Sequence, residues 1–159
     1  MYNDYYQTPI GTLQIEATTK GISKLLFIDQ PVTDICRCDL IKRCIDQLDD
    51  YFAHRLLQFT LTLDLVGTVF QQSVWNQLTS VTYGVTSSYG DIANSLHKPK
   101  AVRAVGAACG KNPVTIIVPC HRIIASNGKL TGYASGLERK SWLLKHEGNA
   151  QHSKLEWRY

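Results

Sequence analysis

Apolar and polar residues alternate over several short stretches in the first part of the chain. Residues 13–17 alternate strictly, a turn follows, and residues 22–28 form a second apolar run, which together predict an antiparallel hairpin. Apolar residues over 40–52 recur at spacings of three and four, which predicts a helix with one buried face. Residues 59–65 again alternate strictly and predict a further strand.

In the second part of the chain the hydrophobic period becomes that of helices. A capping-box pattern at 68–71 opens a predicted helix whose apolar stripe continues to Val81, and residues 83–84 end it. A second capping-box pattern at 88–91 opens a short predicted helix through Leu96. These two start signals place the beginnings of the helices more closely than hydrophobicity alone would.

Two short helices joined by a tight turn predict a helix-turn-helix. Pro99 lies in the connection 97–100, where it cannot continue the first helix but can precede the next. The second helix, 101–109, is rich in Ala and Gly, and Arg103 is its one long side chain before residue 109. Such a face allows close approach to a nucleic-acid groove. It could equally pack against a neighbouring helix and leave Arg103 in solvent.

Composition and segment lengths predict a folded α/β (α+β) chain. Hydrophobic residues make up 44% and charged residues 19% of 159 positions, which excludes disorder. No repeat or linker occurs, and the composition changes near 66–67, so we expect an N-terminal α/β domain (1–66), a second domain (67–150) and a tail (151–159). The best apolar run, 114–118, is far too short to span a bilayer, and no secretory signal opens the chain.

Charge is distributed unevenly along the chain. Residues 1–83 hold six Lys/Arg and nine Asp/Glu, a balance of −3, whereas residues 84–159 hold eleven Lys/Arg and four Asp/Glu, a balance of +7. A basic half beside an acidic half favours a polyanion as partner for the basic half. The alternative is an ordinary solvated surface.

One segment carries the chemistry that the rest of the chain lacks. The apolar run 116–118 predicts a strand that ends at Pro119 and presents Cys120 beside His121. A thiolate is a strong nucleophile when a base or cation makes it available. Adjacent residues of a strand point in opposite directions, so either the backbone turns here or a water links the two side chains. The alternative is that Cys120 only fills a core position.

The other four cysteines suggest no metal site. The chain has five cysteines, an odd number, and without a signal peptide they are expected to be reduced thiols in the cytoplasm. Cys36, Cys38, Cys44 and His54 do not match the usual zinc spacings. Cys109 ends the small-residue helix and either packs in the core or faces the same pocket as the reactive thiol.

The sequence Pro-Cys-His-Arg-Ile-Ile at 119–124 resembles the signature of the O6-alkylguanine-DNA alkyltransferases, also called methylated-DNA–protein-cysteine methyltransferases. Residues 67–148 resemble the family in order and spacing. The further matching segments are 70–75, 88–93, 101–106, 112–113 and 132–148. The resemblance implies an N-terminal ribonuclease H-like domain, an antiparallel sheet with a helix, and a mostly helical, winged-helix-like C-terminal domain with a helix-turn-helix.

The resemblance also implies catalytic roles for five residues. Cys120 would accept the alkyl group, and His121 would act as a base through a water, oriented by Glu147. Asn112 would support this network. Tyr89 would press on the target phosphate and help to protonate the departing guanine.

Further roles implied by the resemblance concern DNA and the alkyl pocket. Arg103 would fill the gap left by the extruded nucleotide, Tyr133 would wall the pocket, and the carbonyls of Cys120 and Ile123 would contact the guanine amine. Arg122 would be structural, tying the motif to the helix-turn-helix. Positions that contact DNA in the family are occupied here by Ala101, Gly106 and Ser126. Further pocket positions are Thr115, Ser135 and Cys109. Thr115 and Ser135 depart from the commonest family pattern and are expected to affect how large an alkyl group fits.

The resemblance implies direct reversal of damage in duplex DNA. A flipped O6-alkylguanine, with O4-alkylthymine a further possible substrate, would pass its alkyl group irreversibly to Cys120. We expect a cytoplasmic monomer that needs no cofactor or metal and contacts no membrane. A lesion-binding protein without chemistry is the first alternative, although the presence of Cys120 argues against it. The second is a cysteine hydrolase, for which the sequence shows no oxyanion hole.

Overall fold

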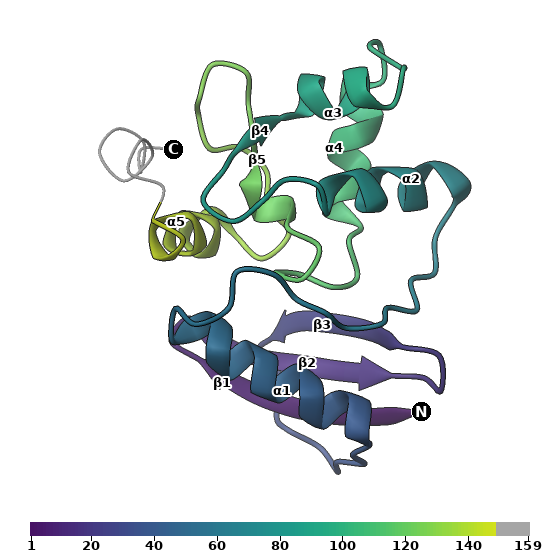
Figure 1. Ribbon diagram of the computed structural model, residues 1–159, viewed down its shortest axis with the longest axis vertical. Coiled ribbons are helices and arrows are strands. Elements are labelled where there is room, and N and C mark those ends of the chain that lie inside the picture. Colours follow the sequence, from purple (N-terminus) through teal and green to yellow (C-terminus); the bar gives the residue numbers. More distant parts are fainter. Residues whose placement is uncertain (149–159) are drawn as a thin grey trace. The chain divides into compact units, whose positions relative to one another are not determined.

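The computed structural model describes residues 1–148 of the chain. These residues divide into two compact units, the first being Met1–Val66 and the second beginning at Gly67. Each unit has its own secondary structure and core (Figure 1). The tail expected at 151–159 lies outside the described residues.

The first unit is a three-stranded antiparallel sheet with one helix. Strands β1 (Tyr2–Thr8), β2 (Gly11–Ala17) and β3 (Ile22–Ile28) pair in the order β1-β2-β3. Helix α1 (Asp39–Phe52) covers one face of the sheet, as Figure 1 shows. The predicted hairpin and the predicted helix are therefore confirmed.

The core of the first unit lies between the sheet and α1. Leu13 and Ile15 of β2 and Leu25 of β3 are fully buried, and Ile41 and Leu48 of α1 are buried with them. The alternating residues that predicted β2 are those that face the helix. The spacing of three and four that predicted α1 likewise marks its buried stripe.

Strand β1 was not predicted, because its sequence, Tyr-Asn-Asp-Tyr-Tyr-Gln-Thr, shows no alternation of apolar and polar residues. Instead its inward side is polar or aromatic. Asp4 is buried and forms an ion pair with Arg37, and the Tyr6 hydroxyl donates a hydrogen bond to Asp49 of α1 at 2.6 Å. Pairing with β2 along its whole length holds this strand in the sheet.

The strand predicted over 59–65 is wrong. Only Leu63 makes a bridge, a single parallel one to Ile22, through Ile22 N–H to the Thr62 carbonyl at 2.9 Å and Asp64 N–H to the Ile22 carbonyl at 2.8 Å. The alternating apolar side chains of this segment are partly buried, and the segment lies along the β3 edge of the sheet. Because two hydrogen bonds do not make a ladder, the segment stays a loop.

Both predicted helix starts in the second unit are confirmed. Helix α2 (Val69–Leu78) begins after Thr68 and helix α3 (Tyr89–Ser95) after Ser88, each with a complete capping box. Helix α2 ends at Leu78. The prediction had extended it to Val81, the last residue of the apolar stripe, but the chain turns before that residue. Thr79 and Ser80 there turn their hydroxyls back onto carbonyls three residues earlier.

The predicted helix-turn-helix consists of α3 and α4 (Val102–Gly110), which pack against each other and against α2 (Figure 1). The small-residue helix packs against neighbouring helices and leaves Arg103 in solvent. Val105 and Ala108 are buried, and the Trp75 indole N–H donates to the Ala108 carbonyl at 2.8 Å. The opposite face, with Arg103, is exposed.

Two short strands and a last helix complete the unit. Strands β4 (Ser87–Ser88) and β5 (Ile123–Ile124) form a parallel pair that brings the residues before α3 beside those after the thiol motif. Helix α5 (Leu137–His146) follows, and its buried Leu143 and Leu144 anchor it in the core. The β4–β5 pair therefore places the thiol motif beside the residues that precede α3, and the residues Cys120–Arg122 also contact α5.

Candidate active site

The backbone turns at the thiol motif, contrary to the predicted strand. Residues 115–117 form a turn, with Ile117 N–H bonded to the Thr115 carbonyl at 2.8 Å and Ile116 in the left-handed region at a φ of 71°. Cys120–Arg122 then form one turn of 3₁₀ helix. Of the two alternatives, a turning backbone is therefore the one observed, and both Cys120 and His121 point into the protein.

Asn112 organises this turn and touches the thiol. Its side-chain amide donates to the Val118 carbonyl at 2.8 Å and to the Cys120 sulfur at 3.2 Å, while its oxygen accepts from Val114 N–H at 2.9 Å. All three bonds are buried. A single side chain thus holds both ends of the turn and positions the Cys120 sulfur, in agreement with a supporting place in the network.

His121 and Arg122 share one buried carboxylate. His121 Nε2 lies 2.8 Å from Glu147 Oε2, and Arg122 donates to both oxygens of Glu147, at 2.8 and 2.9 Å. Arg122 also donates to the Val81 carbonyl at 2.7 Å. The expectation that Arg122 ties the motif to the helix-turn-helix is wrong, since its partners lie after α2 and at the end of α5.

Burial dominates the protonation of this cluster. It raises the pKa of the Cys120 thiol and lowers the pKa of His121, which Arg122 lowers further. Burial alone would raise the pKa of Glu147, but His121 and Arg122 hold it far below its ordinary value. The resting site therefore holds a neutral thiol, a neutral imidazole and a carboxylate. These shifts disfavour an imidazolium–thiolate pair as the resting state.

The thiol opens onto a cavity of about 320 Å³, at the small end of the range for ligand sites. Its lining residues are Tyr89, Gly106, Cys109, Gly110, Cys120, Thr131, Gly132, Tyr133 and Ala134. Cys109 thus faces the same pocket as Cys120, which settles the alternative left open above. The arrangement can place a small electrophile directly against a sulfur nucleophile.

Comparison with known proteins decides the family. Residues 1–65 match the ribonuclease-like domain, and residues 69–149 the DNA-binding domain, of 6-O-methylguanine DNA methyltransferase. The chain belongs to the methylated-DNA–protein-cysteine methyltransferases. Its activity is accordingly the transfer of an alkyl group from DNA to a protein cysteine, a DNA-repair reaction.

Individual relatives cover nearly the whole chain. The methyltransferase of Methanosarcina acetivorans is 44% identical over 155 residues, 94% of this chain and 99% of that protein. That of Mycobacterium bovis is 55% identical over 151 residues, 90% and 92% of the two chains. A crystal structure of the Mycobacterium tuberculosis protein in complex with DNA superposes with a TM-score of 0.85 at 42% identity, covering 94% and 95% of the two chains.

Tyr89 connects the methyltransferase pocket to the helix-turn-helix. It is the first residue of α3, and its hydroxyl donates to the carbonyls of Thr131 at 3.1 Å and Gly132 at 3.4 Å. Tyr133 also lines the cavity, and its hydroxyl forms a hydrogen bond with that of Thr115. Neither Thr115 nor Ser135 lines the cavity, and Thr115 contacts it only through the hydroxyl of Tyr133.

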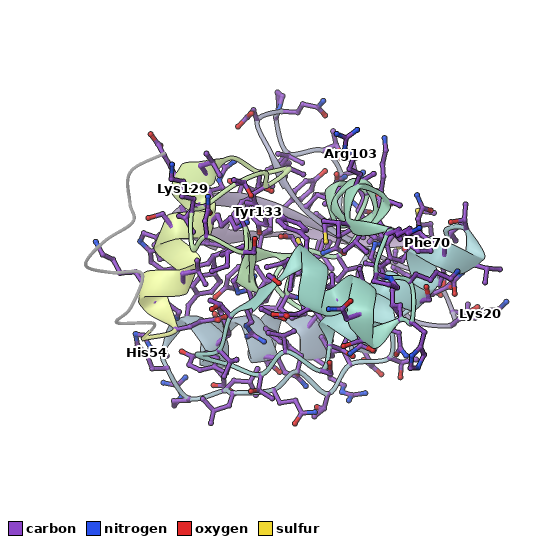
Figure 2. The ribbon with its side chains drawn as sticks, turned by 90° about the horizontal axis from the view of Figure 1, so that it is seen from above. Lys20, His54, Phe70, Arg103, Lys129 and Tyr133 are labelled. Atoms are coloured by element: carbon purple, nitrogen blue, oxygen red, sulfur yellow. The ribbon has the colours of Figure 1, made fainter. Side chains whose placement is uncertain are left out.

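The residues expected to contact DNA lie apart from the buried cluster. Figure 2 shows Arg103 projecting outward from α4, and Ser126 is exposed in the turn before Lys129. Ala101 caps the start of α4 and is half-buried. Of this group only Gly106 lines the cavity.

The sequence reasoning missed Lys140, which is fully buried on α5. Its ammonium donates to the carbonyls of Ile123 and Thr131 at 2.5 and 2.7 Å, so the Ile123 carbonyl expected to contact guanine already has one donor. A signal was present, because Lys140 falls in the apolar stripe of α5 with Leu137 and Leu144. A position in that stripe faces the core, where a lysine is stable only when its ammonium has partners.

Within residues 1–148 there is no group of three side chains that could hold a metal ion, and no helix long and apolar enough to cross a membrane.

Proposed function

We propose that Cys120 is the alkyl acceptor and that an O6-alkylguanine, extruded from duplex DNA, reaches it through the cavity lined by Tyr89 and Tyr133. The observation that carries this proposal is the position of the thiol. It is nearly buried, it opens onto the cavity, and it accepts a hydrogen bond from Asn112. A lesion inside the base stack is inaccessible to such a thiol, so the base must leave the stack.

The chemistry follows from the neutral resting state. His121 takes the thiol proton through a water as the sulfur attacks; its Nδ1 is buried and has no partner among the described residues, which suits that task. The new bond joins sulfur to the alkyl carbon, the carbon–O6 bond breaks, and its electron pair passes to guanine, which Tyr89 helps to protonate. Burial raises the pKa of Tyr89, so its hydroxyl keeps the proton until then.

The reaction consumes the protein. A thioether is a poor leaving group, and the cavity presents no residue that would displace the alkyl group from Cys120. One protein therefore repairs one lesion. We further propose a cytoplasmic monomer, which gel filtration with and without DNA would test.

The partner is duplex DNA bound by the basic part of the chain. Arg103 is exposed on α4 and would occupy the gap of the extruded base, while Ala101, Gly106 and Ser126 would lie along the backbone. The balance of +7 over residues 84–159 suits a polyanion. O4-alkylthymine is a second possible substrate of the same cavity.

The deciding experiment measures stoichiometry with an oligonucleotide labelled in its O6-methyl group. We expect one equivalent of label on the protein, located by peptide mass at Cys120, and none on Cys120→Ala, which still binds DNA. Cys109→Ala is the matched control and should still take up one equivalent. Turnover would indicate a hydrolase, binding without label would indicate a lesion-recognition protein, and label at Cys109 would contradict the role of Cys120.

Arg103 gives a second test. If it holds the gap in the stack, Arg103→Ala should slow transfer from duplex DNA about tenfold or more but leave transfer from free O6-methylguanine unchanged, because only the duplex must be unstacked. Single-turnover rates on both substrates measure this. Lys145→Ala, which removes an exposed cation elsewhere in the unit, is the control. Equal slowing on both substrates would contradict the role.

A further inference from the structure

Lys140 is the most unusual side chain of the second unit. It is fully buried, and its ammonium lies 2.5 Å from the Ile123 carbonyl, 2.7 Å from the Thr131 carbonyl and 3.3 Å from the Gly132 carbonyl. Across residues 1–148 its hydrogen-bond acceptors are carbonyls and no carboxylate, and its ammonium also lies 5.9 Å from the centre of the Tyr89 ring. An ammonium has three donors, so the number of donors matches the number of acceptors.

A buried cation without a counter-ion is costly. Burial lowers the pKa of Lys140 to about 8, which expresses that cost. A neutral amine has only two donors and would leave one of the three carbonyls unpaired. The complete set of three bonds therefore exists only below about pH 8.

The three carbonyls are parts of the site. Thr131 and Gly132 line the cavity, and the Tyr89 hydroxyl donates to the same two carbonyls from α3. Ile123 directly follows the thiol motif. One ammonium therefore joins three segments: α5, the loop that walls the cavity, and the residues that follow Cys120.

Lys140 also brings positive charge to the nucleophile. Burial opposes ionisation of the Cys120 thiol and raises its pKa, and the nearby ammonium of Lys140 acts in the opposite direction. The hydrogen bond from the Asn112 amide is the larger favourable influence on the thiolate, and a backbone hydrogen bond adds to both. The charge on sulfur develops while the alkyl group is being transferred, so a fixed cation nearby lowers the energy of that state.

We propose that Lys140 is a positioning residue of the transfer reaction: it fixes the Thr131–Gly132 wall against which Tyr89 acts, and its charge stabilises the anionic sulfur of Cys120 during attack. This inference rests on the proposed role of Cys120 as acceptor. It adds a residue that contacts neither the alkyl group nor DNA in the proposed reaction.

The test compares Lys140→Met, which keeps length but removes charge and donors, with Lys140→Arg, which keeps the charge. Single-turnover transfer from a duplex containing O6-methylguanine is measured between pH 6 and 10. We expect Lys140→Met to be slowed about tenfold or more at pH 7 and to regain rate at alkaline pH, since its Cys120 ionises later. Lys140→Arg should transfer faster than Lys140→Met at pH 7. Its pH–rate profile should be shifted only slightly toward alkaline pH relative to the wild type.

The wild type supplies a readout that needs no substitution. Its rate should stop rising, or fall, as the pH passes about 8, because Lys140 then loses its charge and one hydrogen bond. Titration of the Cys120 thiol by ultraviolet absorbance should give a higher midpoint for Lys140→Met than for wild type. Lys145→Met on the exposed side of α5 is the control for helix stability and should match wild type in rate and profile.

A Lys140→Met variant with the wild-type rate, pH profile and thiol midpoint would overturn the inference. So would a wild-type rate that rises smoothly through pH 8 to 10, which is decisive even if the variants do not fold. A loss of rate with an unshifted pH profile and thiol midpoint would show a merely structural role and also overturns it. Label at a residue other than Cys120 in the wild type would instead contradict the proposed function.

Discussion

At the scale of single residues, Glu147 contacts two buried side chains, whereas the sequence predicted a contact with one. Its carboxylate contacts His121 Nε2, and it also pairs with the buried guanidinium of Arg122 through two hydrogen bonds. One negative charge therefore serves both the base and a structural cation. Because Arg122 is largely buried, its charge has no easy access to water when Glu147 is changed.

We therefore expect Glu147→Gln to alter both stability and rate. The variant leaves Arg122 buried without a counter-charge, which should cost about 3–5 kcal/mol in the free energy of unfolding. Alkyl transfer at neutral pH should fall and recover partly in alkaline buffer, because His121 accepts a proton less readily without the carboxylate. Denaturant unfolding and transfer rates from pH 6 to 10 measure the two effects.

Glu138→Gln is the matched control, since Glu138 is exposed in the first turn of the same helix. Its loss should cost only a few tenths of a kcal/mol. A Glu147→Gln protein as stable as this control, with a rate profile that overlays the wild type, would remove Glu147 from the site.

At the scale of elements, helices α2 and α3 begin with the same kind of cap, but only α3 begins at the cavity. Thr68 caps α2 and Ser88 caps α3, each with a reciprocal bond from the third helical residue. The first residue of α3 is Tyr89, which lines the cavity, whereas the first residue of α2 is the exposed Val69. The start of α3 therefore bears on function and that of α2 on stability alone.

Substitution of the two caps separates these effects. Thr68→Ala and Ser88→Ala should each lower the free energy of unfolding by about 1 kcal/mol, because each leaves a helix N–H without its acceptor. Only Ser88→Ala should also slow alkyl transfer, since fraying of α3 displaces Tyr89. Thermal unfolding and single-turnover rates of both variants test this. Equal rates for the two variants would show that the α3 cap does not position Tyr89.

At the scale of the whole molecule, the buried ionisable groups of the site are concentrated in the second unit. His121, Arg122, Lys140 and Glu147 are all buried there. The first unit contributes one buried carboxylate of this kind, Asp4, which is paired with Arg37. The response of stability to pH is thus expected to come mainly from the alkyltransferase domain.

Acid should destabilise the protein before most carboxylates titrate. Burial lowers the pKa of folded His121 below 6.5, so the unfolded chain takes up the proton first as the pH falls, and protonation favours unfolding. The stability is complete above about pH 6.5 and declines below it. Glu147, with a lowered pKa, adds a further loss as its ordinary range near 4.5 is passed.

The unfolding temperature at pH 7.5 and 5.5 measures this decline. His121→Gln should lose the part of the decline between these values, whatever its absolute stability. His54→Gln, an exposed histidine of the first unit, should decline like wild type. Equal unfolding temperatures of the wild type at both pH values would show that folding does not lower the pKa of His121.

The sequence alone determined what depends on neighbours three or four residues apart. The capping boxes, the hairpin and the buried face of α1 are of this kind. The six-residue signature at 119–124 is also local, and its order of residues is sufficient to recognise the chemistry. Local hydrogen bonds and a hydrophobic face are written in short sequence patterns, so these predictions were confirmed.

Tertiary structure decided everything that depends on distant contacts. The apolar run 114–118 has strand propensity, yet the Asn112 side chain closes it into turns. Glu147 reaches His121 and Arg122 only because α5 folds back over the motif. The protonation of the thiol and the imidazole follows from desolvation, which depends on packing from all sides and has no local signature in the chain. The apolar stripe of α5 includes Lys140, but only the packed structure supplies the carbonyls that its buried ammonium needs.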